Sequence, residues 1–370
     1  MWLNWRDIKN PEHGGAEVLT HEIATRLVRK RGHKITLFTA HFPGGLTAEN
    51  VDGIYIIREG GRYTVYEKAK TYYERNKNYY DLVIDEVNVK PFLTPKFVKE
   101  KPILALIHQI SAELFSYELP FPLNYIGRYY LEKKWLSYYK EMTVVTVSNS
   151  SKQDLSALGY KNIFVIPEGS GTVPLSAVPQ KESTPTIIFI GRLKRHKRPD
   201  HAIKAFNIIK NELPHAKMWV IGDGYMRTQL EKSCIKDVKF YGYVSSEMKY
   251  DLLMRAHLVL VPSAREGWGL VITEANAMGT PVVAYNVPGL RDSIKDGETG
   301  ILTKENSPDC LASSAISLLK SPQLLKNFSY NALQFSKQFD WNTTSDRFDK
   351  ILMQMLKEIP KRDSKHLETA

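Results

Sequence analysis

Short apolar and β-branched runs alternate with amphipathic stretches along most of the chain. In the first half, runs of strand length occupy residues 34–39, 54–58, 81–84, 103–107 and 143–147. Residues 16–30 differ, because Val18, Ile23 and Leu27 fall on one side of a helix. Gly32 then supplies the residue type that commonly ends a helix, so we predict a helix over 16–30.

The same alternation restarts in the second half. Five further strands are predicted at residues 186–190, 217–221, 238–241, 258–261 and 281–284. Helices are predicted at residues 200–211, 226–232, 246–255 and 271–278. Strands that alternate with helices form parallel sheets with helices on both faces. Two rounds of this pattern predict an α/β protein with two Rossmann-like, doubly wound domains.

A polar stretch rich in glycine and proline, residues 168–185, separates the two rounds. It predicts a first domain at 1–172 and a second at 173–340. A last helix, residues 341–359, either packs on the second domain or crosses back to the first. We expect residues 361–370 to be a frayed end.

Composition narrows the class of protein. The 370 residues are 43% hydrophobic and 25% charged, which is typical of a soluble globular protein. Two cysteines cannot form a disulfide framework. No apolar run approaches the ~18 residues of a membrane span, and the N-terminus lacks the apolar core of a signal peptide. We therefore expect a cytoplasmic protein.

The net charge of +11 favours anionic partners: nucleotides, nucleic acid or acidic membranes. The basic residues are spread along the chain, so a nucleic-acid partner is not expected. Residues 113–139 interleave aromatic side chains with lysine and arginine. That mixture suits a membrane interface, sugar stacking or an ordinary helix packed on the core.

The segment 265–274 carries the strongest sign of chemistry. It follows a predicted strand and opens a helix, and Gly267 and Gly269 allow a ligand to approach the backbone. Free N–H groups at a helix start suit phosphate. Glu266 lies on the loop and Glu274 two turns later, where a carboxylate can accept hydrogen bonds from a ribose diol. A glycine turn with two solvated glutamates is the alternative.

Other candidates lie where predicted strands end. Arg192 and Lys197 follow strand 186–190, and a guanidinium with an ammonium group can clamp a diphosphate. A solvated basic loop is the alternative. His108 follows strand 103–107, where a structural, hydrogen-bonded histidine is equally compatible. Ser150 with Gln153 fits a helix-capping box.

Several motifs are absent from the sequence: an Asp-x-Asp pair, a Walker loop, a zinc-spaced Cys/His cluster and a Gly-x-Ser-x-Gly elbow. We therefore expect no metal site and no obligatory cofactor.

Taken together, the motifs resemble the family 4 glycosyltransferases of the GT-B fold, which have two domains facing a central cleft. The resemblance implies that residues 1–172 bind the acceptor and residues 173–340 bind the nucleotide-sugar donor. Glu266 and Glu274 have the spacing of that family's E-x7-E motif, around Gly267-Trp268-Gly269. Gly191-Arg192-Leu193 and Lys197 match its phosphate-clamping loop.

The first half resembles the family in fewer places. Gly14 and Gly15 are similar to its glycine loop, and His108 falls where many members have an active-site histidine. Two positions depart from the family pattern. Arg198 stands where a glycine usually follows the clamp lysine, and Glu168 where members often have asparagine.

The resemblance implies roles for these residues. Arg192 and Lys197 would neutralise the donor diphosphate, Glu274 would hold the ribose, and Glu266 would contact the transferred sugar. The remaining contacts would come from backbone N–H groups and from the first half. They are Trp268, Leu270 and Val271 with the neighbouring glycines, Gly15 against the diphosphate, and His108 near the sugar or acceptor.

The implied reaction is transfer of a sugar, with retention, from a UDP- or GDP-sugar to a hydroxyl acceptor without an obligatory metal. Residues 113–139 and the positive charge suggest a lipid-linked or cell-surface glycan as acceptor, and an anionic membrane as a possible partner. A sugar phosphorylase, a nucleotide-sugar epimerase and a non-catalytic basic nucleic-acid or membrane-binding protein are the alternatives.

Overall fold

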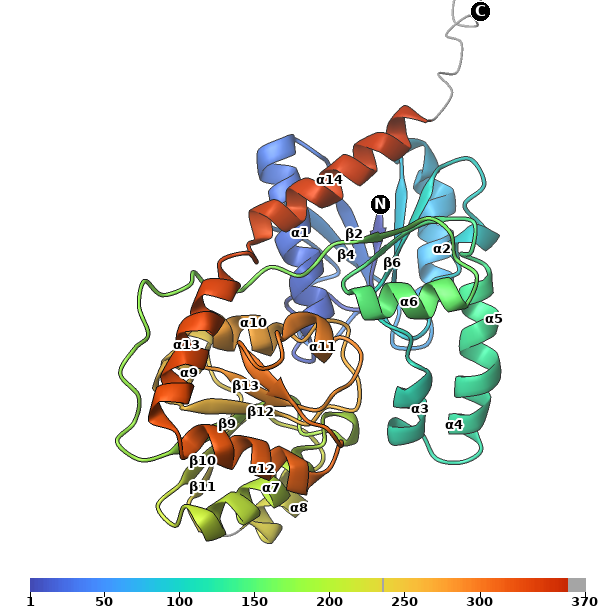
Figure 1. Ribbon diagram of the computed structural model, residues 1–370. Helices are drawn as coiled ribbons and strands as arrows, with labels where there is room; N and C mark the ends of the chain where they lie inside the picture. The colour runs from blue at the N-terminus through green and yellow to red at the C-terminus, as the bar shows by residue number, and fades with distance from the viewer. Residues whose placement is uncertain (235, 359–370) are drawn as a thin grey trace, which may run out of the picture.

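Two β-sheets, each flanked by helices, build the molecule (Figure 1). The computed structural model describes residues 1–234 and 236–358; the predicted end at 361–370 and the last residue of helix 341–359 lie outside them. The two parallel-sheet α/β halves confirm the predicted fold class. The division at residue 172 stays a prediction.

The first sheet has the strand order β3-β4-β2-β1-β5-β6-β7-β8, and every neighbouring pair is parallel except β3 with β4. Its strands are β1 Trp2–Leu3, β2 Thr36–Thr39, β3 Ala48–Val51, β4 Ile54–Arg58, β5 Val83–Val87, β6 Ile103–Ile107, β7 Thr143–Thr146 and β8 Ile163–Val165. Although β1 has only two residues, it is central and fully buried.

The helices of the first half include a hairpin that projects from the sheet (α3 to α5 in Figure 1). They are α1 Gly15–Arg31, α2 Val65–Asn76, α3 Ala112–Glu118, α4 Leu123–Ile126, the π-helix η3 Gly127–Leu131, α5 Glu132–Ser137 and α6 Asn149–Ala157, with the short 3-10 turns η1 Lys77–Tyr79 and η2 Thr94–Lys96. Gly32 ends α1 at φ 73°, as predicted.

The predicted capping box at Ser150 is wrong. Ser148 is the N-cap of α6, and its hydroxyl accepts a hydrogen bond from the backbone N–H of Ser151 at 3.2 Å. The cap lies two residues earlier because the chain is still extended at Ser148, with φ −145°.

The second sheet is entirely parallel, in the order β11-β10-β9-β12-β13-β14. Its strands are β9 Thr186–Ile190, β10 Lys217–Ile221, β11 Val238–Gly242, β12 Leu258–Val261, β13 Val282–Ala284 and β14 Gly300–Leu302. Its helical segments are η4 Arg195–Lys197, α7 Pro199–Glu212, α8 Arg227–Ser233, α9 Ser246–Arg255, α10 Leu270–Ala277, α11 Leu290–Ser293, α12 Pro308–Leu319 and α13 Pro322–Ser336.

The last helix, α14 (Trp341–Lys357), crosses back to the first half and lies beside α1 (Figure 1). The ring of Phe348 stacks on Trp2 with centroids 5.4 Å apart. Arg31 and His33 contact Asp346 and Asp349 of α14 at 2.9 and 2.7 Å. Of the two placements predicted for this helix, the crossing one is therefore correct.

The strand predicted at 81–84 lies instead at Val83–Val87. Its charged residues Asp85 and Glu86 are buried. The carboxylate of Asp85 accepts hydrogen bonds from the backbone N–H groups of Phe92 and Thr94, each at 3.1 Å, which offset the cost of burying it. The sequence analysis also missed β3, β8 and β14, which are short and sit at or near sheet edges.

Candidate active site

Loops that follow the carboxyl ends of strands from both sheets meet between the two halves. A Cβ atom at Gly14 would lie 3.4 Å from Nη2 of Arg192, and one at Gly15 would lie 3.4 Å from Leu270. A Cβ at Gly267 would lie 3.1 Å from the backbone oxygen of His108. Parallel α/β sheets bind ligands at this edge, so these loops define the candidate active site.

The side chain of Glu17 fixes the glycine turn before α1. The carboxylate of Glu17 accepts a hydrogen bond from the backbone N–H of Gly14 at 2.6 Å and one from Arg6 at 3.2 Å. Gly14 has an extended backbone, with φ −146°, which any residue can adopt. What glycine contributes at this position is therefore the absence of a side chain. Arg192 can thus come close to the turn.

Arg192 is partly buried and, among the described residues, has no side-chain hydrogen bond or ion pair. Burial and the positive charge of Arg6 lower the pKa of Arg192 against the opposing effect of nearby carboxylates. A guanidinium that is desolvated without a close counter-charge is unfavourable until an anion binds. Arg192 is therefore suited to holding an anionic ligand.

Lys197 and Glu266 form the other side of the clamp. Nζ of Lys197 lies 2.5 Å from Oε1 of Glu266. Burial would raise the pKa of Glu266, but Lys197 overcomes this effect and lowers it, so the carboxylate is charged. Arg198, which departs from the family pattern, leads away from this pair: it donates a hydrogen bond to Tyr117 of α3.

The backbone turns sharply into α10 at Gly269, whose φ is 92°. Leu270 and Val271 begin the helix, so their N–H groups belong to its unsatisfied first turn. The side chain of Trp268 is only 4% exposed and packs against Phe339, which makes it a core residue. The contact that the resemblance implies for Trp268 would therefore be made by its backbone N–H group and not by its side chain.

Glu274 lies within α10 and is 9% exposed. Its Oε1 accepts hydrogen bonds from Nζ of Lys249 at 2.6 Å and from the hydroxyl of Tyr250 at 3.3 Å. A Cβ at Gly171 would lie 3.0 Å from the same oxygen. The sequence analysis missed these three partners, because no local motif connects them to a residue at least 24 positions away.

His108 is buried between two carboxylates. Its Nε2 lies 2.9 Å from Glu86, and its Nδ1 lies 3.8 Å from Glu168, an ion-pair contact. Glu86 also accepts hydrogen bonds from Trp2 and Thr20. Burial would lower the pKa of His108, but the hydrogen bonds and charges of Glu168 and Glu86 raise it to about 10. His108 is therefore an imidazolium at neutral pH.

Most of the predicted residues lie on loops at the facing strand ends, whereas Leu270, Val271 and Glu274 lie in α10. Gly14, Gly15 and His108 come from the first half. Those of the second half follow β9 or β12: Gly191, Arg192, Lys197, Glu266, Gly267, Trp268, Gly269, Leu270, Val271 and Glu274. The roles of these residues stay proposals.

The helical hairpin over 112–137 contradicts, in part, the interpretation that the aromatic and basic segment 113–139 packs on the core. Phe115 and Leu136 pack on the core, but the tip exposes its apolar side chains: Leu119, Phe121, Leu123, Tyr125, Ile126, Tyr129, Tyr130 and Leu131. Phe121 is 81% exposed and Tyr130 is 65% exposed. Core packing is therefore wrong for residues 119–131.

Within residues 1–234 and 236–358, no helix is both long and apolar enough to cross a membrane. The same residues contain no group of three or more His, Cys, Asp or Glu side chains placed to hold a metal ion.

Comparison with known proteins identifies the protein family to which the chain is related. Residues 13–170 match the model of the family described as Glycosyltransferase Family 4, and residues 175–335 match that of Glycosyl transferases group 1. The chain is 29% identical to a D-inositol 3-phosphate glycosyltransferase of Thermobispora bispora over 187 residues, 47% of this chain and 44% of that protein. The matched part spans about half the length of this relative.

Solved structures share the fold across almost the whole chain. A sucrose-phosphate synthase from Thermosynechococcus elongatus has a TM-score of 0.80 at 19% identity, covering 96% of this chain and 98% of its own. Anabaena HepE in complex with UDP-glucose has a TM-score of 0.73 at 18% identity, covering 95% and 98%. The molecule is a two-domain α/β protein of the GT-B type. By its sequence it belongs to the group 1, family 4 glycosyltransferases.

Proposed function

We propose that this protein transfers a sugar, with retention of anomeric configuration, from a nucleoside-diphosphate sugar to a hydroxyl acceptor. The observation that carries the proposal is Arg192, a partly buried guanidinium that forms no ion pair within residues 1–234 and 236–358 and is set against the glycine turn at Gly14. Lys197 lies on the same loop. Two cations beside a side-chain-free turn are suited to a diphosphate.

Glu274 would hold the ribose. Its carboxylate is already oriented by Lys249 and Tyr250, which both donate to Oε1, and the two oxygens of a carboxylate can accept the two hydroxyls of a ribose diol. A solved relative of this fold is described as bound to UDP-glucose, which supports a uridine nucleotide ahead of a guanosine nucleotide.

In the reaction, the bond between the anomeric carbon and the diphosphate oxygen breaks and the acceptor oxygen bonds to the same carbon. The diphosphate leaves with the electron pair, and Arg192 and Lys197 stabilise its growing charge. The proton of the acceptor hydroxyl passes to the leaving phosphate oxygen on the same face. His108, already protonated, is not a base, and the resemblance would place it near the transferred sugar.

We assign the neutralisation of the leaving diphosphate to these two side chains, so the reaction would need no metal. Calorimetric titration with UDP, GDP and their sugar conjugates, with and without EDTA, tests both the donor and this point. We expect one nucleotide to bind equally with EDTA and about tenfold more weakly to E274Q. Absence of any nucleotide binding to folded protein would overturn the proposal.

For the acceptor, we infer a lipid-linked or membrane-proximal glycan at a cytoplasmic membrane face. The exposed apolar tip of the hairpin, residues 119–131, is flanked by the exposed lysines Lys133 and Lys134. Apolar rings beside cations suit insertion at the surface of an anionic bilayer. The hairpin also contacts the donor loop, because Glu118 accepts hydrogen bonds from the N–H and Nδ1 of His196, so a docked hairpin would bring the membrane to the site.

A further inference from the structure

A row of cations and aromatic rings lies at the carboxyl edge of the first sheet, outside the donor clamp. Trp5 and Arg6 follow β1, Arg62 follows β4, and Lys90 follows β5. The strands β4, β2, β1 and β5 are consecutive neighbours in the parallel part of the sheet. The three loops therefore share one edge, the same one that carries the glycine turn and His108.

The side chains of this row contact one another. The guanidinium carbon of Arg6 lies 4.6 Å from the centre of the Trp5 ring, and that of Arg62 lies 5.7 Å from it. Nζ of Lys90 lies 3.9 Å from the centre of the Tyr66 ring. Arg62 also acts electrostatically on Tyr66, whose pKa burial raises to about 12 against that effect. We call these five residues the edge ladder: Trp5, Arg6, Arg62, Tyr66 and Lys90.

Counter-charges are missing from most of the ladder. Among the described residues, Arg62 and Lys90 form no ion pair, and Arg6 alone has carboxylate partners, Glu12 and Glu17. The indole N–H of Trp5 is buried without a hydrogen-bond acceptor in the same part of the chain. Arg62 is exposed and Lys90 is partly buried, so an anion can reach both cations and form charge-assisted hydrogen bonds with them.

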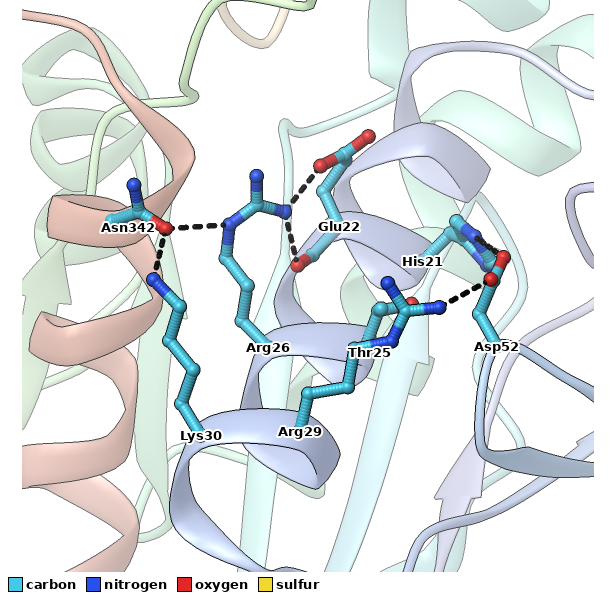
Figure 2. A pocket seen from close by; sticks show the side chains of 8 residues that line it. All are labelled: His21, Glu22, Thr25, Arg26, Arg29, Lys30, Asp52 and Asn342. Carbon is cyan, nitrogen blue, oxygen red and sulfur yellow. Dashed lines mark hydrogen bonds and ion pairs between the residues drawn. The ribbon is translucent and has the colours of Figure 1, made fainter.

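A second basic surface shows the opposite arrangement. In the hollow along the outer face of α1, Arg26 is paired with Glu22, Arg29 with Asp52, and Lys30 with Asn342 (Figure 2). The cations of that hollow already have partners of their own chain. Arg62 and Lys90 of the ladder thus differ from the cations of this hollow, which have partners.

The ladder begins beside the donor clamp. The charge of Arg6 helps to lower the pKa of Arg192 and of Lys194, in both cases after the larger effect of burial. Positive charge therefore continues from the clamp, through Arg6, to Arg62 and Lys90. A group bound on the ladder would lie on the first-half side of the reacting centre, where a second substrate must approach.

We propose that the edge ladder binds the acceptor through an anionic group, a phosphate or a carboxylate, held by Arg62 and Lys90. This inference rests on the proposed function, since it assigns the second substrate of the same site. Arg62 lies over the ring of Trp5 and Lys90 over the ring of Tyr66, so the two rings position these cations for charge-assisted hydrogen bonds to the anion.

The test compares three hexoses that share a ring and differ in charge: glucose, glucose 6-phosphate and glucuronic acid. Their affinities are measured by ligand-detected NMR, first without nucleotide and then with saturating UDP. We expect at least one anionic hexose to bind about tenfold more tightly than glucose in both conditions. The phosphate and carboxylate arms show which anion the ladder prefers.

R62Q and K90Q should each remove most of that advantage and leave the affinity for UDP unchanged. R29Q is the matched control, because it removes one cation from the paired hollow of Figure 2 and should change neither affinity. Anionic hexoses that bind no better than glucose, or that bind equally well to R62Q and K90Q, would overturn the inference while UDP binding kept the proposed function. If no nucleotide bound but the dependence on Arg62 and Lys90 persisted, the proposed function alone would fail.

Discussion

Two buried carboxylates, Glu86 and Glu168, flank the imidazole of His108. The pKa of His108 is raised to about 10 from an ordinary value near 6.5, so its protonated form stabilises the fold. A group whose pKa is higher in the folded than in the unfolded state stabilises the fold as long as it is protonated. The contribution is complete below about pH 6.5 and is lost as the pH rises through about 10.

We therefore predict that H108Q lowers the free energy of unfolding by about 3 kcal/mol at pH 6.5, since it leaves buried carboxylates without their cation. The difference from wild type should shrink steadily towards pH 10. Urea unfolding at several pH values measures it, with the exposed His215 as control in H215Q. A difference that stays constant with pH would contradict the assigned charge of His108.

The two donor residues should differ in what they affect. R192Q removes charge stabilisation of the leaving group, so we predict a fall in kcat of about 100-fold with a smaller change in nucleoside affinity. E274Q should chiefly weaken nucleotide binding and raise the donor KM. Steady-state kinetics on the donor identified by titration separates the two, and equal losses in both parameters for both variants would refute the division of roles.

At the scale of elements, α14 joins the ends of the chain. Phe348 is fully buried and stacks on Trp2 of the central strand, so the last helix completes the core of the first half. We predict that F348A lowers the free energy of unfolding by about 3–5 kcal/mol. M353A changes a 41% exposed side chain of the same helix and should cost far less. Chemical denaturation measures both, and equal effects would show that α14 is not part of this core.

The hairpin of α3 to α5 is the element with the most exposed apolar surface. We predict that F121S and Y130S each weaken binding to vesicles containing phosphatidylglycerol about tenfold, because each removes a ring that would be buried in the bilayer surface. Y79S, which changes an 82% exposed tyrosine of η1, is the control. Vesicle co-sedimentation at low salt measures this, and a wild-type protein that ignores such vesicles would end the membrane proposal.

At the scale of the whole molecule, contacts from several elements hold the two halves together. Arg265 donates to Asp154 of α6, and the backbone N–H of Ser150 donates to Asp292 at 3.1 Å. Glu118 reaches the donor loop at His196. These contacts lie around the facing strand ends, so they hold the glycine turn of the first half against the donor clamp of the second.

Much of this organisation could be predicted from local pattern. The strand Thr186–Ile190 and the helix Ser246–Arg255 have the predicted bounds, because apolar periodicity and caps are local signals. The candidates Arg192, Lys197, Glu266 and Glu274 were singled out because each follows a predicted strand within one short segment; their roles stay predictions. Strands with little apolar signal, such as Ala48–Val51, were missed for the same reason.

By itself, the sequence determined the two rounds of strand and helix, the place of each glycine turn and the chemical types of the clamp. Only the tertiary structure decided which residues meet. It paired Lys249 and Tyr250 with Glu274, set His108 between Glu86 and Glu168, and brought α14 back onto β1. Within the part of the chain that the structure describes, it also left Arg62 and Lys90 without an ion pair, because the fold and not the order along the chain decides which charges meet.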